Sequence, residues 1–198
     1  MALSNNTELK AAIADWLNRS DLTTQIVDFI TLTESRIAAE LKTNDTHVTT
    51  TLAVDAQSED LPADYSGMVR LTFGDYYPTL IYLPPDEFWT RYLSNYNGKP
   101  AAYTIEANKI YFGPTPDQAM TLNYTYIAKP DIATDSTNRV LTMYPGLYLF
   151  GALSEAYSFL GDTESQMVAE SKYQQALAMA NASDQFKGPL NMIIPGIV

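Results

Sequence analysis

The chain has 198 residues, a net charge of −11 and no cysteine. This length suits one domain, or a helical part with one sizeable insertion, and a hydrophobic content of 46% is too high for a disordered chain. The lack of cysteine excludes disulfides and thiol chemistry and fits folding in a reducing cytoplasm. No apolar run reaches the roughly 18 residues of a membrane helix, and the first ten residues lack the regions of a signal peptide, so no membrane association is expected.

The strong negative charge bears on nucleic acids. An acidic protein does not wrap nucleic acid by neutralising phosphates. It could instead surround DNA without adhering to it, because a wall of like charge repels a polyanion. The simpler alternative is that the charge only keeps the protein soluble.

The first 45 residues are expected to form two helices of a bundle. Asn5 is placed to cap the first helix, with Glu8 reaching back to it. The apolar stripe of this helix consists of Leu9, Ile13, Trp16 and Leu17.

The second helix is predicted from Asn18 to Leu41, with Ser20 or Asp21 at its start. Its apolar side recurs in steps of three and four, which puts these residues on one face: Leu22, Ile26, Phe29, Ile30, Thr33, Ile37 and Leu41. The polar residues off this stripe, Glu34, Arg36 and Glu40, are expected to face water.

Residues 46–135 are expected to form a β-rich, antiparallel insertion. Strands are predicted at 46–54, 68–73, 79–83, 102–105, 110–112 and 120–127. A short helix is predicted at 84–95, with a proline and acids in its first turn. Asn108 tolerates the left-handed conformation of a tight hairpin turn. In the last strand, Leu122, Tyr124 and Tyr126 alternate with Thr121, Asn123 and Thr125, which indicates one buried and one exposed face.

Residues 136–183 are expected to return to the bundle with two helices. The segment from Leu147 to Leu160 is apolar nearly all round and should be central and buried. Gly161 and Asp162 break it, and Thr163 with Gln166 is predicted to cap the next helix. The apolar side of that helix consists of Ala169, Tyr173, Ala176, Leu177 and Ala180. The fold class is therefore α+β, mainly α.

Residues 184–198 are predicted to form an extended arm. A Gly-Pro pair and a Pro-Gly pair make a helix unfavourable there. The segment is nevertheless apolar, which predicts that it binds in a groove. It either folds back on its own domain or binds a neighbouring subunit or partner. The candidate binding residues are Phe186, Pro189, Leu190, Met192, Ile193, Ile194, Pro195, Ile197 and Val198.

No catalytic constellation is evident, so no enzyme activity, metal or cofactor is predicted. His47 is the only histidine, which opposes a zinc site or a Ser-His-Asp triad. Paired carboxylates for glycan cleavage remain possible on paper; the candidates are Glu8, Asp15, Asp64, Asp75, Asp86, Glu87 and Glu155. Glu155 lies in the apolar helix, where the alternative is an ion pair with Arg19, Arg36 or Arg139. The fourteen tyrosines also allow a carbohydrate-binding module, although core packing explains them.

Several blocks of the sequence, taken in order, resemble phage head-to-tail adaptor proteins (connector, tail accessory or tail tubular A-like proteins), which join the portal to the tail. The first block runs from Leu9 to Leu41, and the second is the elbow from Leu61 to Tyr65. The third begins at Gly98 and continues through the strand at Ile110, and the fourth runs from Tyr144 to Leu153. These blocks span most of the chain.

The resemblance implies a structural virion protein at the head-tail junction, assembled in the host cytoplasm. It implies a ring of identical subunits, expected to be dodecameric, with helices forming the ring body and the arm reaching the portal protein. The other expected partner is a tail nozzle or tail tube protein, and genomic DNA would pass through the ring without specific binding. A virion-associated peptidoglycan hydrolase is the alternative function.

Overall fold

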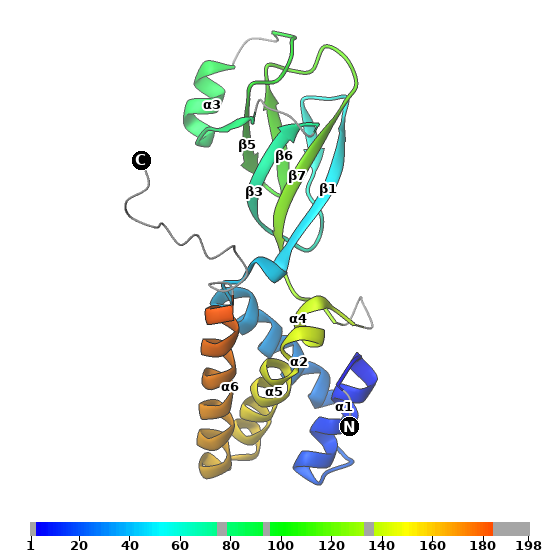
Figure 1. Cartoon of the computed structure of the whole chain (residues 1–198), viewed down its shortest axis with the longest axis vertical. Helices are drawn as coiled ribbons and strands as arrows, with labels where there is room; N and C mark the ends of the chain where they lie inside the picture. Colours follow the sequence, from blue (N-terminus) through cyan, green and yellow to red (C-terminus); the bar gives the residue numbers. More distant parts are fainter. Residues whose placement is uncertain (1–2, 75–78, 93–95, 133–136, 184–198) are drawn as a thin grey trace, which may run out of the picture. The chain divides into compact units, whose positions relative to one another are not determined.

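The computed structural model describes residues 3–74, 79–92, 96–132 and 137–183. The chain divides into two compact units (Figure 1). The helical unit is built from residues 1–46 and 129–198, and the β unit is residues 47–128. All described strands belong to the β unit, and five of the six described α-helices belong to the helical unit. The predicted α+β class is confirmed.

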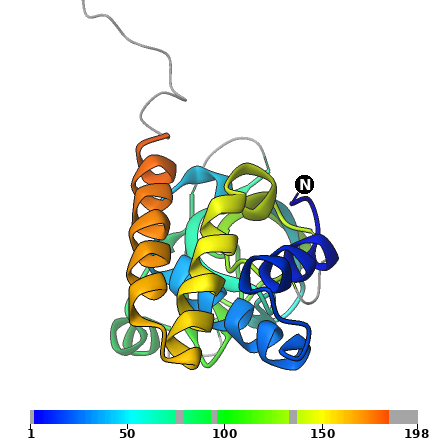
Figure 2. The same cartoon turned by 90° about the horizontal axis from the view of Figure 1, so that it is seen from below.

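Helix α5 (Pro145–Leu160) forms the centre of the helical unit. Figure 2 shows it between α6 (Thr163–Ser183) and α1 (Asn6–Leu17), and it also packs on α2 (Thr23–Glu40). The most buried residues of α5 are apolar on several sides: Leu147, Tyr148, Ala152, Leu153 and Ala156. The prediction that this helix is buried is confirmed up to Ala156, whereas Phe159 and Leu160 at its end are exposed.

The start of α1 follows the predicted cap with one change. The Asn5 side chain accepts a hydrogen bond from the Glu8 backbone N–H at 2.9 Å. The Glu8 carboxylate, however, reaches Ser4 instead of Asn5, and accepts from both its N–H (2.8 Å) and its hydroxyl (2.7 Å). The helix ends where Asn18 adopts the left-handed conformation, at φ 51°.

Helix α2 begins five residues later than predicted. Asn18 serves as the C-cap of α1, so the following residues become the link between the two helices. Leu22 stands at the N-cap of α2 and makes no side-chain cap hydrogen bond. Asp21, one of the two predicted caps, instead pairs with Arg19 at 2.6 Å. The apolar stripe of α2 is buried as predicted.

The expectation that the polar residues of α2 face water is wrong for Glu34. Its side chain is buried, because the segment that returns to the helical unit at Ile132 covers this side of the helix. Arg36 and Glu40 are half-buried and also bonded: Arg36 pairs with carboxylates of α5 and α6, and Glu40 accepts from the Tyr173 hydroxyl at 2.9 Å.

Two features of the C-terminal helices differ from prediction. A short helix, α4 (Arg139–Met143), precedes α5 and is capped by the Asn138 side chain, which accepts from the Leu141 N–H. The cap of α6 is Asp162, not Thr163, because its carboxylate accepts from the Ser165 N–H at 3.1 Å. The predicted apolar side of α6 is confirmed, with Ala176 only half-buried.

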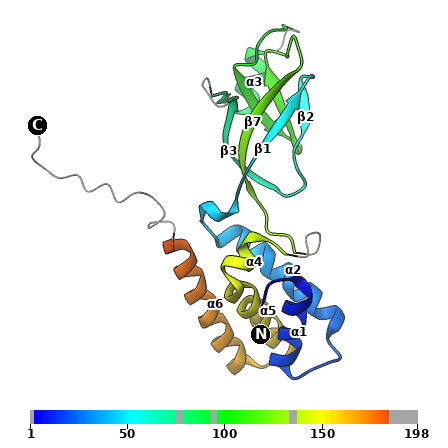
Figure 3. The same cartoon turned by 45° about the vertical axis from the view of Figure 1, so that its right-hand side comes forward.

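The β unit contains two sheets that share one core. The first has the order β1-β7-β3 (Figure 3), formed by His47–Val54, Met120–Ala128 and Tyr65–Phe73. The second has the order β2-β6-β5-β4, formed by Ser58–Asp60, Lys109–Gly113, Ala102–Glu106 and Ile81–Tyr82. Leu71 and Leu122 from the first sheet and Ile110 and Phe112 from the second lie in the same buried cluster. Helix α3 (Pro85–Arg91) packs on β5 and is shorter than predicted.

The strand predictions are largely correct in the β unit. The β5–β6 hairpin is confirmed, and both turn residues, Ala107 and Asn108, have positive φ. The β7 face with Leu122, Tyr124 and Tyr126 is buried as predicted. Thr125, expected to be exposed, is buried, and its hydroxyl lies 2.9 Å from that of Thr49 on β1. Strand β4 pairs in parallel with β5, so the second sheet is mixed.

Candidate interaction surfaces

The predicted partner-binding residues lie outside the described residues. They are Phe186, Pro189, Leu190, Met192, Ile193, Ile194, Pro195, Ile197 and Val198. The last described residue is Ser183, at the end of α6. The contacts that hold this end of α6 therefore determine where the arm starts.

Hydrogen bonds tie the end of α6 to Tyr144, which precedes α5, and to residues 42–45, which follow α2. The Tyr144 hydroxyl donates to the Asp45 carboxylate at 2.7 Å and lies 2.8 Å from the Ser183 hydroxyl. Asp45 is buried and also accepts from the exposed guanidinium of Arg139. Two residues earlier, the Asn181 side chain accepts from the Lys42 N–H at 2.7 Å. These bonds hold the last described residues of α6, Asn181 and Ser183, against the rest of the helical unit.

A second polar group links α2, α5 and α6. Arg36 donates to Glu155 at 3.2 Å and to Glu170 at 2.7 Å, and its guanidinium lies over the Tyr173 ring at 4.3 Å. This resolves the three alternatives for Glu155 in favour of Arg36. Hydrogen bonding from Arg36 lowers the pKa of Glu170, and Gln174 and Ser154 act in the same direction. The contact between the helices thus favours the charged form of the Glu170 carboxylate.

The buried carboxylate of Glu34 forms a third polar group. It accepts from the Ile132 N–H at 2.6 Å and from the Tyr148 hydroxyl at 3.1 Å. The Asn138 side chain in turn donates to the Tyr148 oxygen at 2.6 Å. Burial raises the pKa of Glu34, and these hydrogen bonds oppose the rise. The group fastens the segment that returns from the β unit onto α2 and α5.

Part of the helical unit's surface is apolar. Trp16 on α1 is 52% exposed although it belongs to the predicted apolar stripe. The other large exposed apolar residues of this unit are Val27, Leu32, Met143, Phe159, Leu160, Met167, Val168 and Met179. Scattered apolar side chains are ordinary on a protein surface, but a cluster of them beside a hollow is typical of a contact site.

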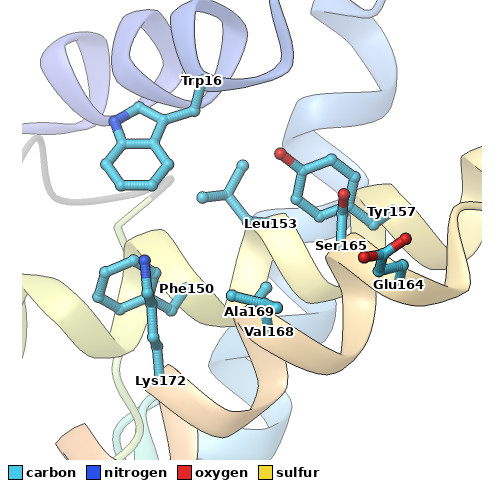
Figure 4. Close-up of a pocket in the computed structure, with 9 residues that line it drawn as sticks. All are labelled: Trp16, Phe150, Leu153, Tyr157, Glu164, Ser165, Val168, Ala169 and Lys172. Carbon is cyan, nitrogen blue, oxygen red and sulfur yellow. The ribbon is translucent and has the colours of Figure 1, made fainter.

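Such a hollow, here called the α1–α6 pocket, has a volume of about 240 Å³. Its lining is mostly apolar or aromatic and comes from α1, α5 and α6: Trp16, Phe150, Leu153, Tyr157, Glu164, Ser165, Val168, Ala169 and Lys172. Figure 4 shows Trp16, Phe150 and Lys172 together at one end, and Tyr157, Ser165 and Glu164 at the other. The Lys172 ammonium lies 5.4 Å from the Trp16 ring centre and 5.1 Å from that of Phe150.

This pocket was not predicted from the sequence. Trp16 was expected on the apolar stripe of the first helix, and no role was predicted for Lys172. One feature of the sequence could have indicated the pocket. Trp16 is a large side chain near the end of a short amphipathic helix, and tryptophan is rarely buried completely. The facing residues come from positions more than 130 residues away, and their approach depends on how α1 packs on α5.

With the geometry in view, comparison with known families is decisive. The sequence profile of the SU10 adaptor protein family matches residues 4–193, which is nearly the whole chain. The chain belongs to this family. It is therefore a phage adaptor, a structural protein, and the predicted family is confirmed. Membership implies a place at the head-tail junction of a phage particle. A search among curated proteins found no match for this adaptor.

The β unit of the adaptor carries its own exposed apolar residues. Ile81 and Tyr82 on β4 and Tyr96 are more than half exposed. Tyr126, by contrast, is buried, and its hydroxyl donates to both oxygens of Asp64 at 3.1 Å. Desolvation, with Asp64 nearby, raises the pKa of Tyr126 to about 12.

Most of the carboxylates that were considered for glycan cleavage lie in the described part of the adaptor. Within those residues no group of three His, Cys, Asp or Glu side chains could hold a metal ion. Glu8 binds Ser4, Asp64 binds Tyr126 and Glu155 binds Arg36, so three of the candidate carboxylates have structural partners. Asp15 lies on α1, Asp86 and Glu87 lie in the first turn of α3, and Asp75 is outside the described residues. His47 begins β1. No described helix is long and apolar enough to cross a membrane.

Proposed function

We propose that this adaptor assembles into a ring of identical subunits, expected to be dodecameric, that joins the portal to the tail nozzle or tail tube. The observation that carries the proposal is the family match over residues 4–193, which includes both units. The ring would stand at the head-tail junction and assemble in the host cytoplasm. A closed ring needs two different contact surfaces on each subunit, one on each side. The exposed apolar residues of the helical unit are candidates for one of them.

The arm is the proposed anchor to the portal or to a neighbouring subunit. Its apolar residues would fill grooves in the partner: Phe186, Leu190, Met192, Ile193, Ile194, Ile197 and Val198. Pro189 and Pro195 restrict the backbone, which reduces the conformational entropy lost on binding. Ser183 is held by Tyr144 and Asn181 by Lys42, which supports a defined direction at the start of the arm.

The negative charge supports passage of DNA without adhesion. The adaptor carries 23 acidic and 12 basic side chains. A channel wall with an excess of carboxylates repels the phosphate backbone and releases no condensed counterions on contact. The genome would therefore move through the ring without specific binding.

The first experiment is a mass measurement of the purified adaptor, alone and after mixing with a portal ring. We expect one fixed number of adaptor chains on each portal ring. Ile193→Asp should weaken this complex at least tenfold, because it places a charge in an apolar groove. Asn191→Asp is the matched control, since it adds the same charge to the arm without removing an apolar side chain.

Results opposite to these would contradict the adaptor proposal and favour the alternative function, a peptidoglycan hydrolase. An adaptor that does not bind portal rings contradicts the proposed function, and an adaptor that binds them equally well with Ile193→Asp contradicts the proposed role of the arm. Clearing of purified peptidoglycan, abolished by a single Glu→Gln change, would establish the glycan hydrolase instead. No group of residues in the described structure specifically favours that activity.

A further inference from the structure

We propose that in the free subunit the α1–α6 pocket holds the proline-bearing segment 189–198 of the same chain. The pocket would thus be the resting place of the arm before it meets a partner. Both the pocket and the arm belong to the isolated subunit, so this docking does not depend on the identity of that partner.

The size of the pocket argues for a peptide side chain as its occupant. Its volume of about 240 Å³ lies below the roughly 300–1,000 Å³ of typical small-molecule sites. It is also open to the surface, with Trp16 52% exposed and Val168 54% exposed. A site of this kind suits one or two apolar side chains of a segment lying across it.

The lining favours a proline-bearing segment. Trp16 and Phe150 meet edge to face with ring centres 5.8 Å apart, and Tyr157 lies farther along the pocket (Figure 4). Aromatic-lined grooves are the usual receptors of extended, proline-containing peptides, because the flat rings pack against the proline ring. In this chain, Pro195 stands between Ile194 and Ile197, so a proline comes with apolar neighbours.

Two hydrogen-bond donors at the pocket are available to such a segment. Lys172 makes no ion pair with any described residue, and the Trp16 indole N–H has no hydrogen-bond partner among them. An extended peptide has backbone carbonyls that no internal hydrogen bond satisfies. An ammonium and an indole N–H can donate to such carbonyls. The pocket therefore offers both an apolar surface and a means of holding the backbone.

The tether is long enough. Lys172 lies eleven residues before Ser183 on α6, which is about 17 Å along a helix. The eleven residues 184–194 can span roughly 36 Å when extended, about twice that distance, so Pro195 can reach the level of Lys172 after the chain turns back. Ile197, two residues farther on, then comes to the level of Val168, which lies four residues before Lys172 on α6. Because Ser183 is held by Tyr144, the tether starts from a constrained point.

The covalent connection between α6 and the arm favours the chain's own arm, and not that of another copy, as the occupant of the pocket. A short flexible tether gives the attached segment an effective concentration that is roughly millimolar. Dilute free subunits do not match that concentration, so the same chain's arm occupies the pocket first. This would cover apolar surface on both the pocket and the arm until a partner with higher affinity captures the arm.

A disulfide trap tests the proposal in the full-length chain, which has no cysteine of its own. Val168→Cys in the pocket is combined with Ile197→Cys in the arm. The matched control combines Met179→Cys with Ile197→Cys. Met179 is 69% exposed on the same helix and lies closer to Ser183, so random collisions favour the control. We expect the Val168 pair to form an intramolecular disulfide at least tenfold faster under mild oxidation.

Three outcomes would overturn the proposal. The first is a control pair that oxidises as fast as the Val168 pair, and the second is the absence of any disulfide. The third is disulfide-linked dimers, which would make a second copy the occupant. These outcomes are read on isolated subunits, and they are therefore separate from a failure to bind portal.

A second measurement avoids changes in the pocket. In a Trp89→Phe background, Trp16 is the remaining tryptophan. Ile197→Asp should release the arm and increase quenching of Trp16 by acrylamide about twofold, whereas Asn191→Asp should not. Equal quenching in the Ile197→Asp variant and its parent contradicts docking of the arm at Trp16.

Discussion

Replacing Gly151 by alanine tests how closely three helices of the helical unit pack. Gly151 lies inside α5, where a β-carbon would overlap the γ-methyl group of Thr33 on α2 and lie 3.3 Å from the Tyr173 ring on α6. Thr33 is completely buried, and its hydroxyl donates to the Phe29 carbonyl at 2.8 Å. Its methyl group therefore has little room to move away.

Two opposing effects set the magnitude. Alanine is about 1 kcal/mol better than glycine in a helix interior. Forcing an extra carbon into a well-packed core costs about 1–3 kcal/mol. Because the overlap is with Thr33, whose side chain is fixed by burial and a hydrogen bond, we expect the cost of overpacking to exceed the gain in helix propensity. Gly151→Ala should therefore lower the free energy of unfolding by about 1 kcal/mol. The midpoint temperature of thermal unfolding of the helical unit should fall by about 4–8 °C.

The assay is urea unfolding followed by Trp16 fluorescence in a Trp89→Phe background, so that the signal comes from the helical unit. Thr33→Ser removes the methyl group and keeps the hydroxyl, and it should cost about 1 kcal/mol by itself. Combined with Gly151→Ala, it should restore much of the lost stability, because the new methyl group fills the vacated space. The coupling should be at least about 1 kcal/mol.

Two results would refute this reasoning. A Gly151→Ala variant about 1 kcal/mol more stable than the parent would mean that helix propensity alone decides the outcome. Additive effects in the double variant would mean that Gly151 and Thr33 do not compete for the same space.

Three further predictions concern the polar groups of the helical unit. Burial raises the pKa of Glu34 in the folded state above its unfolded value of about 4.5, so ionisation of Glu34 lowers stability as the pH rises through this range. In urea titrations between about pH 4 and pH 7, Glu34→Gln should therefore become more stable relative to the parent as the pH rises. A stability difference that stays constant with pH would contradict this. Arg36→Met should cost about 1–3 kcal/mol at pH 7 by leaving two carboxylates unpaired. Since Arg36 lowers the pKa of Glu170, this loss should shrink as pH falls below about 4.5, and a loss independent of pH would count against the ion pair. Tyr144→Phe should cost about 1–3 kcal/mol and speed hydrogen exchange at the end of α6, because buried Asp45 loses a donor; Ser183→Ala, which keeps that donor, is the control, and equal exchange in both variants would refute the anchoring role of Asp45.

Local patterns in the sequence were sufficient for most of the elements. The stripe from Ile26 to Ile37 predicts α2, and the alternation of Leu122, Tyr124 and Tyr126 predicts the buried face of β7. The hairpin turn at Asn108 follows from the conformations that asparagine tolerates. These features depend on residues within one or two turns of each other, so one sequence is enough to detect them. The order of blocks along the chain likewise indicated the adaptor family.

The exact first residue of a helix was harder to predict from the sequence, because several neighbouring short polar residues could each serve as its N-cap. Asn18 ends α1, which moves the start of α2 beyond Ser20 and Asp21. Similarly, Asp162 caps α6 in place of Thr163. A cap depends on the backbone conformation of the residue before the helix, and neighbouring candidates differ little in intrinsic preference.

By itself, the sequence determined five of the six described α-helices, most of the strands, the apolar composition of the arm and the family. Only the tertiary structure decided that Glu34 is buried, that Asp45 and Tyr144 hold the end of α6, and that Trp16 and Lys172 share a pocket. Glu34 meets Ile132 across 98 positions, and Lys42 meets Asn181 across 139. Periodicity shows which face of a helix is apolar, but the partner of a polar side chain depends on which distant segment packs beside it. That choice is made by the packing of the whole unit, since a buried polar group is stable only where a hydrogen-bond partner is brought to it.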